Sequence, residues 1–441
     1  MNLQQPLVGA TKPGKLPAVI DTTLPNGLRV LAARKPGLPM VQVRLRIDVA
    51  RSKGWGDGLI EEIAGQTIVT GTESRSQLEI ADELRTLGAV MSTSVDSEDM
   101  YIAGTTVSTE LSKYLSVLAD VIQNATHPED ELALAKGQAE QGLAIAGSQP
   151  ETRARYALAQ RLFPGHPYGQ SLPTPDLVAP ITRAQVRKFQ KTMVTPNAAL
   201  IVLVGDMPPA KMVAAVDKAI GRWSGTRRVG RTPVPAPVTP GPIQVVHHPG
   251  AVQTSMRLGG IGVNRAAADF PALMLALVIL GGGFTSRLNH NLREDKGYTY
   301  GAGAGMSHNL AATQITVSAD VQTAVTAPAF VETMYELGRM ATLPVSEDEL
   351  AAAKRYIAGS LALSVQTQAG LASYLTTLAV AGLDVSFLRD LPLAADKLTV
   401  EDIAAASAKY LAPSVLAPVL LGDADQIADS VALLGASEVL A

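Results

Sequence analysis

The segment Glu129-Asp130-Glu131-Leu132-Ala133-Leu134-Ala135-Lys136 returns in the second half of the chain as Glu347-Asp348-Glu349-Leu350-Ala351-Ala352-Ala353-Lys354. Seven of the eight positions are identical, and each copy continues into further helix-forming sequence. This repeat predicts that one long helix occurs twice in the chain, at equivalent places of two related parts.

Three further pairs of segments follow the two copies in the same order. Ile181-Thr182, Pro196 and Val204-Gly205-Asp206 are echoed by Leu398-Thr399, Pro413 and Leu421-Gly422-Asp423, and the separation is the same for each pair. Solenoid repeats have periods of about 20 to 50 residues, so a period of half the chain indicates a duplicated domain.

A proline-rich stretch, Thr232 to Pro242 (TPVPAPVTPGP), separates the two parts. Such a sequence cannot continue a helix or a central strand, and it is typical of a stiff, extended linker. We therefore expect an N-terminal domain over residues 1–225, a linker over 226–242 and a homologous C-terminal domain over 243–441.

Each part begins with strand-like sequence. Leu28 to Ala33 follows an Asn26-Gly27 turn, and Val41 to Val49 alternates apolar and polar residues. Apolar helical segments follow at residues 59–69 and 270–280, then alternating strands near residues 101–107 and 314–321, then long amphipathic helices. This order predicts an α+β fold, in which each half is a mainly antiparallel sheet with helices packed on one side.

The composition of the 441 residues excludes several functions. A net charge of −3 provides no basic surface for nucleic acid or for an anionic membrane, and no window is apolar enough to span a bilayer. Without cysteine, any metal would have to bind histidine and carboxylate side chains. The six histidines are scattered, and none is paired with another at i, i+4. We expect a protein or peptide partner, and no metal bound to this chain.

The N-terminal residues Met1 to Lys15 lack the apolar core of a signal peptide. A signal peptide that has been removed leaves no trace, and a chain without cysteine is suited to either side of a bacterial inner membrane. We expect the bacterial periplasm, with the cytoplasm as the alternative.

The helix predicted over residues 59–69 has an apolar stripe at positions 59, 60, 63, 64, 67 and 68. Glu62, Gly65 and Gln66 share the opposite face. This spacing is notable because two histidines at i and i+4 can hold a zinc ion while a neighbouring glutamate serves as general base.

The chain resembles the pitrilysin, insulinase and mitochondrial processing peptidase family of zinc metallopeptidases over nearly its whole length. The segments that carry the resemblance in the first half are Leu24-Pro25-Asn26-Gly27-Leu28-Arg29-Val30, Gly58-Leu59, Gly71-Thr72, His166-Pro167-Tyr168-Gly169 and Pro196-Asn197 through Gly205-Asp206. Active members carry His-x-x-Glu-His on the helix that corresponds to residues 59–69, and a glutamate in a later helix completes the zinc site.

Aligned on Gly71-Thr72, the two histidine positions are Glu62 and Gln66, the general-base position is Gly65, and the distal ligand position is Gly142. One carboxylate and one amide do not form a zinc site of useful affinity. We interpret Glu62 and Gln66 as ordinary solvated residues of an amphipathic helix. The resemblance thus implies a chain that has lost its own zinc.

The best match to the family lies in the second half, where residues 280–288 (LGGGFTSRL) lead into residues 292–301 (LREDKGYTYG). The family has an arginine and, seven residues later, a tyrosine that reach a zinc site on another half or subunit, and Arg293 and Tyr300 fit that spacing. The resemblance implies that Arg293 donates to substrate carbonyls and that Tyr300 stabilises the oxyanion. Tyr298, expected on the same side, is a competing candidate for the hydroxyl.

The glycines of this region have two interpretations. Gly281, Gly282 and Gly283 belong to the matching segment, so we expect them beside bound substrate. A phosphate loop is not favoured, because no Gly-Lys-Ser/Thr follows and the loop comes after a helix. The alternating glycines of residues 301–305 indicate a strand that another backbone approaches closely.

These observations favour the zinc-free subunit of a heterodimeric peptidase, in which a homologous partner carries His-x-x-Glu-His and the zinc ion. Arg293 and Tyr300 would act on a peptide enclosed between the two subunits. A catalytically inert structural or peptide-binding protein of the same fold is the alternative. A homodimer with a different chemistry is a third possibility, which no nucleophile constellation supports.

Overall fold

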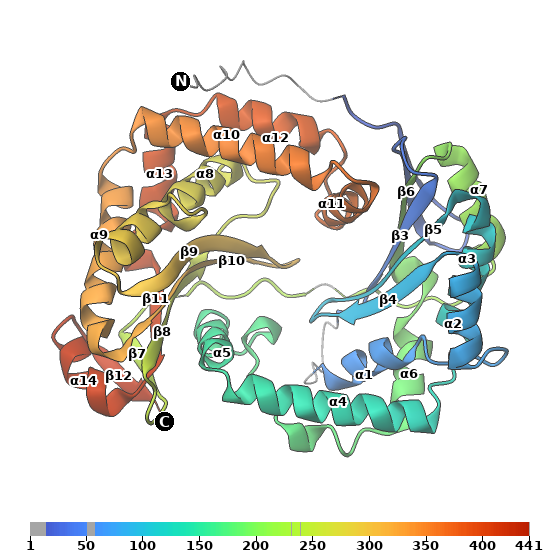
Figure 1. Cartoon of the computed structure of the whole chain (residues 1–441), viewed down its shortest axis with the longest axis horizontal. Coiled ribbons are helices and arrows are strands. Elements are labelled where there is room, and N and C mark those ends of the chain that lie inside the picture. Colours follow the sequence, from blue (N-terminus) through green and yellow to red (C-terminus); the bar gives the residue numbers. More distant parts are fainter. Residues whose placement is uncertain (1–14, 51–57, 231, 239, 441) are drawn as a thin grey trace, which may run out of the picture.

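Each half of the chain forms one six-stranded sheet, and the two sheets have matching strand orders. The order is β1-β2-β6-β3-β5-β4 in the first half and β12-β7-β11-β8-β10-β9 in the second. The computed structural model describes residues 15–50, 58–230, 232–238 and 240–440. The two sheets lie on opposite sides of the molecule, each with helices of its own half on its outer face (Figure 1).

The first half contains both short strands and long helices. Its strands are β1 (Val19–Thr23), β2 (Arg29–Arg34), β3 (Met40–Asp48), β4 (Val90–Val95), β5 (Asp99–Val107) and β6 (Ala199–Gly205). Its helices are α1 (Leu59–Thr67), α2 (Gln77–Thr86), α3 (Leu111–Asn124), α4 (Glu129–Ser148), α5 (Pro150–Leu162), α6 (Arg183–Met193) and α7 (Pro209–Ile220).

The second half repeats this pattern after the linker. Its strands are β7 (Ile243–His247), β8 (Gln253–Ile261), β9 (Thr299–His308), β10 (Thr313–Gln322), β11 (Ala417–Gly422) and β12 (Ser437–Leu440). Its helical segments are α8 (Phe270–Gly281), the π-helical η5 (Asn289–Asp295), α9 (Thr326–Thr342), α10 (Glu347–Ser364), α11 (Gln368–Val380), α12 (Phe387–Asp396), α13 (Val400–Tyr410) and α14 (Ala424–Ala432). None of the helices that the structure describes is long and apolar enough to cross a membrane.

Both sheets are mainly antiparallel, as the sequence predicts. In the first sheet only β2 and β6 run parallel, and in the second the parallel pairs are β7 with β11 and β12 with β7. The outer strands differ because β1 is antiparallel to β2, whereas β12 comes from the C-terminal end of the chain and is parallel to β7. The α+β class is confirmed; the domain boundaries at 225/226 and 242/243 stay a prediction.

The duplicated segment makes the same contacts in both halves. Lys136, at the end of the repeated motif in α4, donates from Nζ to the carbonyls of Ala179 at 2.6 Å and Ile181 at 2.9 Å. Its counterpart Lys354 in α10 donates to two carbonyls at the equivalent place, at 2.8 and 2.7 Å. The repeat thus preserves tertiary contacts as well as helix-forming sequence, which supports the duplication.

One helix of each half packs on the sheet of the other half. The sequence predicts helices on one side of each sheet only, so these two helices are a difference from the prediction. Helix α5 lies on the second sheet, and α11 lies on the first (Figure 1). The α5 contact joins Leu158, Leu162 and Phe163 to Ala417 and Val419 of β11. The α11 contact joins Leu371, Ala372, Leu375 and Ala379 to Leu31, Ala33, Leu200, Val202 and Val204. These exchanged apolar contacts hold the halves in one fixed arrangement.

A buried carboxylate also joins the halves. Glu98, which is 6% exposed, lies between β4 and β5 and accepts hydrogen bonds from the Tyr168 hydroxyl at 2.5 Å and the backbone N–H of Leu310 at 2.9 Å. The Thr232 hydroxyl donates to the same carboxylate at 3.2 Å, and the N–H of Ala311 donates to Tyr168 at 3.1 Å. The tip of the β9–β10 hairpin is therefore fixed to the first half and to the linker.

Candidate active-site residues

Arg293 and Tyr300 lie at the surface of the second half. Arg293 belongs to η5, and its guanidinium carbon lies 4.4 Å from the centre of the Phe284 ring. Tyr300 is 94% exposed and Phe284 is 65% exposed. A cation over an aromatic face at an exposed site is stabilised by about 0.5–1 kcal/mol. Phe284 therefore supports the Arg293 side chain, while the Tyr300 side chain stands open to whatever docks here.

A β-bulge sets the direction of Tyr300. The pairing of β9 with β10 shifts register between Thr299 and Ala302, so that Tyr300 and Gly301 together oppose Asp320. The Thr299 hydroxyl closes the bulge by donating to the Asp320 carbonyl at 2.7 Å and accepting from the Gly301 N–H at 3.2 Å. Bulges bend a strand and re-aim side chains, often beside active sites. The bulge thus accounts for a large aromatic side chain that projects away from the sheet.

Tyr298, the competing candidate for the hydroxyl, differs from Tyr300 in burial. Tyr298 precedes β9 and is half-buried against the apolar core of the second half, whereas Tyr300 is almost fully exposed. Of these two phenols, Tyr300 is the one presented to solvent.

The glycine run after α8 serves close packing. A Cβ on Gly281 would lie 2.4 Å from the backbone nitrogen of Ala304 and 2.7 Å from the carbonyl carbon of Gly303, so only glycine lets the end of α8 touch β9. A Cβ on Gly282 would lie 2.7 Å from Cα of Val278. Space is open around Gly283. The backbone of α8 does approach β9 at Gly303 and Ala304, but the residue that must be glycine is Gly281. A Cβ on Gly301, Gly303 or Gly305 would meet no atom of the described residues closer than 3.8 Å, so the close approach does not explain the alternating glycines of β9.

The helix that corresponds to the zinc-binding helix of active enzymes is α1. Glu62 and Gln66 lie one turn apart on it, with Nε2 of Gln66 donating to Oε1 of Glu62 at 3.3 Å. Both are half-buried, and burial raises the pKa of the Glu62 carboxyl above its ordinary value. The interpretation of these two side chains as solvated holds only in part, because α4, α6 and β4 pack against α1 while Glu62 still lines a cavity.

The general-base position is closed by a neighbouring side chain. Gly65 faces β4, and a Cβ built on it would lie 2.3 Å from Cγ2 of Val95. Real carbon atoms do not approach so closely, so no side chain fits at position 65 without movement of β4 or Val95. The distal position, Gly142 on α4, has open space around it and carries no side-chain donor.

These residues do not fit a zinc ion. Zinc in proteins takes imidazole, thiolate and carboxylate ligands in near-tetrahedral geometry, and peptidase sites use three such protein ligands. The corresponding positions here offer one carboxylate, one amide and two glycines. The histidine nearest to α1 is His127, whose ring nitrogens already bond the Thr67 hydroxyl at 2.7 Å and the Gln190 side chain at 2.8 Å.

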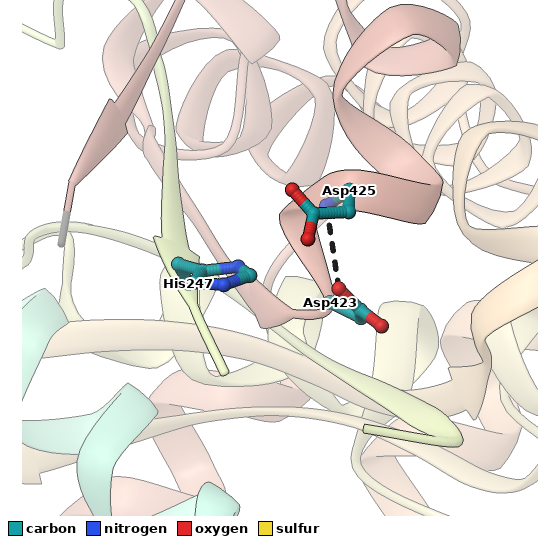
Figure 2. A group of neighbouring side chains, drawn as sticks. All are labelled: His247, Asp423 and Asp425. Atoms are coloured by element: carbon teal, nitrogen blue, oxygen red, sulfur yellow. Dashed lines mark hydrogen bonds between the residues drawn. The ribbon is translucent and has the colours of Figure 1, made fainter. Parts of the chain in front are cut away.

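One group of possible metal ligands occurs elsewhere in the described residues: His247, Asp423 and Asp425 (Figure 2). Asp423 caps α14, and its carboxylate accepts from the N–H of Asp425 at 3.3 Å and from the Gln426 amide at 2.6 Å. His247 uses Nδ1 to accept from the Ala424 N–H at 3.1 Å. These bonds give the group a structural role as the cap of α14.

A cavity of about 770 Å³ separates α1 from the second sheet. Glu62 lines it from the first half, Arg155 from α5, and Gln314, Thr316 and Ser318 from β10. Arg293, Tyr300 and the three glycines are not among its lining residues. The chain therefore does not bring its own Arg293 and Tyr300 to its own degenerate zinc position.

Two supporting residues of this region carry no clear signal in the sequence. Phe284 supports Arg293, and Thr299 closes the bulge under Tyr300. Phe284 stands inside the matching segment, but a stacking role needs the turn between α8 and η5 to be known. Gly301 directly after Tyr300 is compatible with a bulge, although glycine in a strand is equally typical of a tight bend or of a close backbone approach.

Two sequence profiles match the chain in succession. Residues 65–176 match the profile described as insulinase (peptidase family M16), and residues 180–357 match the profile described as the peptidase M16 inactive domain. This chain belongs to the M16 peptidase family.

Curated relatives named as zinc proteases are similar over part of their length. An uncharacterized zinc protease of Mycobacterium leprae is 25% identical over 293 residues, which is 66% of this chain and 66% of the relative. A second, from Mycobacterium tuberculosis, is 26% identical over 63% of this chain and 65% of its own length. A third, from Rickettsia bellii, is 23% identical over 77% of this chain and 82% of its own. The matched region thus spans just under two thirds of the mycobacterial proteins.

Solved structures share the M16 fold over nearly the whole chain. A peptidase M16 inactive domain from Pseudomonas fluorescens superimposes with a TM-score of 0.85 at 24% identity, covering 92% of this chain and 98% of that one. A protease from Helicobacter pylori gives a TM-score of 0.82 at 19% identity, with 92% and 100% covered. The arrangement of two sheet-and-helix halves is therefore that of the family.

Proposed function

We propose that this M16 chain is the zinc-free subunit of a two-chain peptidase, whose homologous partner carries His-x-x-Glu-His and the zinc ion. The observation that carries the proposal is a contrast between the halves. The ligand positions of α1 are lost and Val95 fills the space beside Gly65, whereas Arg293 and Tyr300 are kept, with Arg293 half-buried on Phe284 and Tyr300 94% exposed. A residue pair that does not line the cavity beside its own α1 suits a site on another chain.

In such a complex the partner's zinc would supply the activated water and polarise the scissile carbonyl. Arg293, which stacks on the Phe284 ring, would donate hydrogen bonds from its guanidinium to backbone carbonyls of the peptide. These bonds would hold the peptide in a fixed position relative to the zinc site. The Tyr300 hydroxyl would donate to the oxygen that becomes negatively charged as the peptide bond is attacked.

We also propose the bacterial periplasm as the compartment, which fractionation of cells would test.

The test is the complex reconstituted with a similar-sized chain that carries His-x-x-Glu-His, assayed on a fluorogenic peptide. Tyr300→Phe should lower kcat about 100- to 1000-fold, because one donor to the oxyanion is lost. Arg293→Ala should lower kcat/KM by a comparable factor. Tyr356→Phe, which removes the hydroxyl of another exposed tyrosine on α10, is the matched control and should leave turnover unchanged.

The isolated chain provides an independent check. It should contain no stoichiometric zinc by elemental analysis and should not cleave the peptide. Zinc at one ion per chain, or activity without a partner, would overturn the proposal. Full activity of the complex with both Tyr300→Phe and Arg293→Ala would favour the alternative of an inert structural or peptide-binding subunit.

A further inference from the structure

We infer that Asn289 is a positioning residue, which holds the bulged start of β9 and thereby aims Tyr300. The inference rests on the proposed function and deepens it, because it names a residue behind the pair that meets the substrate. Asn289 is the first residue of η5 and is 9% exposed, so it does not contact a docked peptide itself.

Asn289 bonds both backbone groups of one β9 residue. Its Oδ1 accepts from the N–H of Ala302 at 3.0 Å, and its Nδ2 donates to the C=O of Ala302 at 2.9 Å. β9 is the edge strand of the second sheet, so these two groups point away from β10 and have no neighbouring strand. The side-chain amide of Asn289 therefore takes the place of a neighbouring strand at this one residue.

The bonded residue lies directly after the bulge. Ala302 is the first β9 residue to pair regularly with β10 once Tyr300 and Gly301 have bulged out. The Thr299 hydroxyl fixes the other side of the bulge, through the Asp320 carbonyl. Held at both ends, the backbone of the bulge is restrained, and with it the direction in which the Cα–Cβ bond of Tyr300 leaves the strand. Without Asn289, only the Thr299 side would remain.

Asn289 also fixes the loop that carries the platform of Arg293. Its Nδ2 reaches the Gly283 carbonyl at 3.1 Å and the Ser286 hydroxyl at 3.2 Å, on either side of Phe284 and Thr285. Arg293 follows in the same η5 segment, one turn further on. One buried amide thus joins the glycine run, η5 and β9, the three segments that place Phe284, Arg293 and Tyr300.

The test compares Asn289→Ala with Asn291→Ala in the reconstituted complex. Asn291 is the same residue type in the same segment and is 8% exposed, but its amide donates to Glu332 and Glu336 of α9, each at 3.0 Å, and not to β9. The two variants therefore remove a similar buried amide from one segment. Asn289→Ser, which leaves a small hydroxyl, serves if the alanine variant does not assemble.

Two readouts are measured on each variant. Hydrogen exchange of the peptide covering residues 299–303 should accelerate at least about tenfold in Asn289→Ala, because the Ala302 N–H loses its acceptor, and should not change in Asn291→Ala. In the peptidase assay kcat should fall about 10- to 100-fold for Asn289→Ala, since a displaced Tyr300 no longer meets the oxyanion, while KM changes less than threefold. Asn291→Ala should retain kcat within twofold.

The outcomes separate the inference from the function on which it rests. Unchanged exchange at residues 299–303 overturns the inference whatever the activity. Faster exchange with unchanged kcat, in a complex that Tyr300→Phe does slow, overturns the positioning role and leaves the proposed function standing. A complex that neither Tyr300→Phe nor Asn289→Ala slows contradicts both.

Discussion

The contact between Gly65 and Val95 gives a prediction with a defined magnitude. Glycine inside a helix costs about 1 kcal/mol relative to alanine, so Gly65→Ala would stabilise α1 if the new methyl group had room. It would instead lie 2.3 Å from Cγ2 of Val95, nearer by more than 1 Å than the ordinary carbon–carbon contact of about 3.5–4.0 Å. Overpacking of this kind costs about 1–3 kcal/mol. We expect a net loss of up to about 2 kcal/mol in the free energy of unfolding.

Shortening the Val95 side chain should reverse the sign of the effect of Gly65→Ala on the free energy of unfolding. On a Val95→Ala background the same Gly65→Ala change should stabilise the protein by about 1 kcal/mol, because only the helix propensity remains. Urea unfolding of the four proteins of this cycle measures the coupling energy between the two positions, which should be about 1–3 kcal/mol. Equal effects of Gly65→Ala on both backgrounds would refute the reasoning, and with it the claim that Val95 closes the general-base position.

Two further predictions concern buried groups. Tyr114→Phe should raise the free energy of unfolding by about 1 kcal/mol in urea, because the Tyr114 hydroxyl is buried without a hydrogen-bond partner in the described chain; a loss would show that the hydroxyl is bonded. Burial lowers the pKa of His127, so near pH 6.5 this histidine binds a proton in the unfolded chain but stays neutral in the folded chain. The free energy of unfolding should therefore not depend on His127 above pH 6.5. As the pH falls below 6.5, it should decrease by up to about 1.4 kcal/mol per pH unit. His127→Asn, a residue that tolerates the positive φ of 50° at this position, should flatten that slope, and an unaltered slope would contradict the assignment.

Much of the fold can be predicted from the sequence, because its signals are local or periodic. The repeated motif ending at Lys136 and Lys354 indicates the duplication, and alternating residues indicate strands such as β3 and β10. Hydrophobic periodicity reports which face of an element is buried. It does not report which element covers that face, so the exchange of α5 and α11 between the halves cannot be read from it.

The candidate site also has features that can be read from the sequence and features that cannot. The loss of ligands at Glu62, Gly65 and Gln66 can be read from the sequence, because ligand chemistry depends on residue type at fixed spacing. The position of Val95 beside Gly65 cannot be read from the sequence, because the whole of α2 lies between α1 and β4 along the chain. Likewise Arg293 and Tyr300 are recognised by spacing, whereas their support by Phe284 and Asn289 arises only when α8, η5 and β9 meet.

The sequence by itself determined that the chain is a duplicated α+β protein without a set of zinc ligands, because these properties follow from residue identity and order. Only the tertiary structure decided that Tyr300 projects outward from a bulge and that Gly65 is closed by Val95. Both depend on distances of a few ångströms between segments distant in sequence, and such distances are set by the packing of the whole molecule.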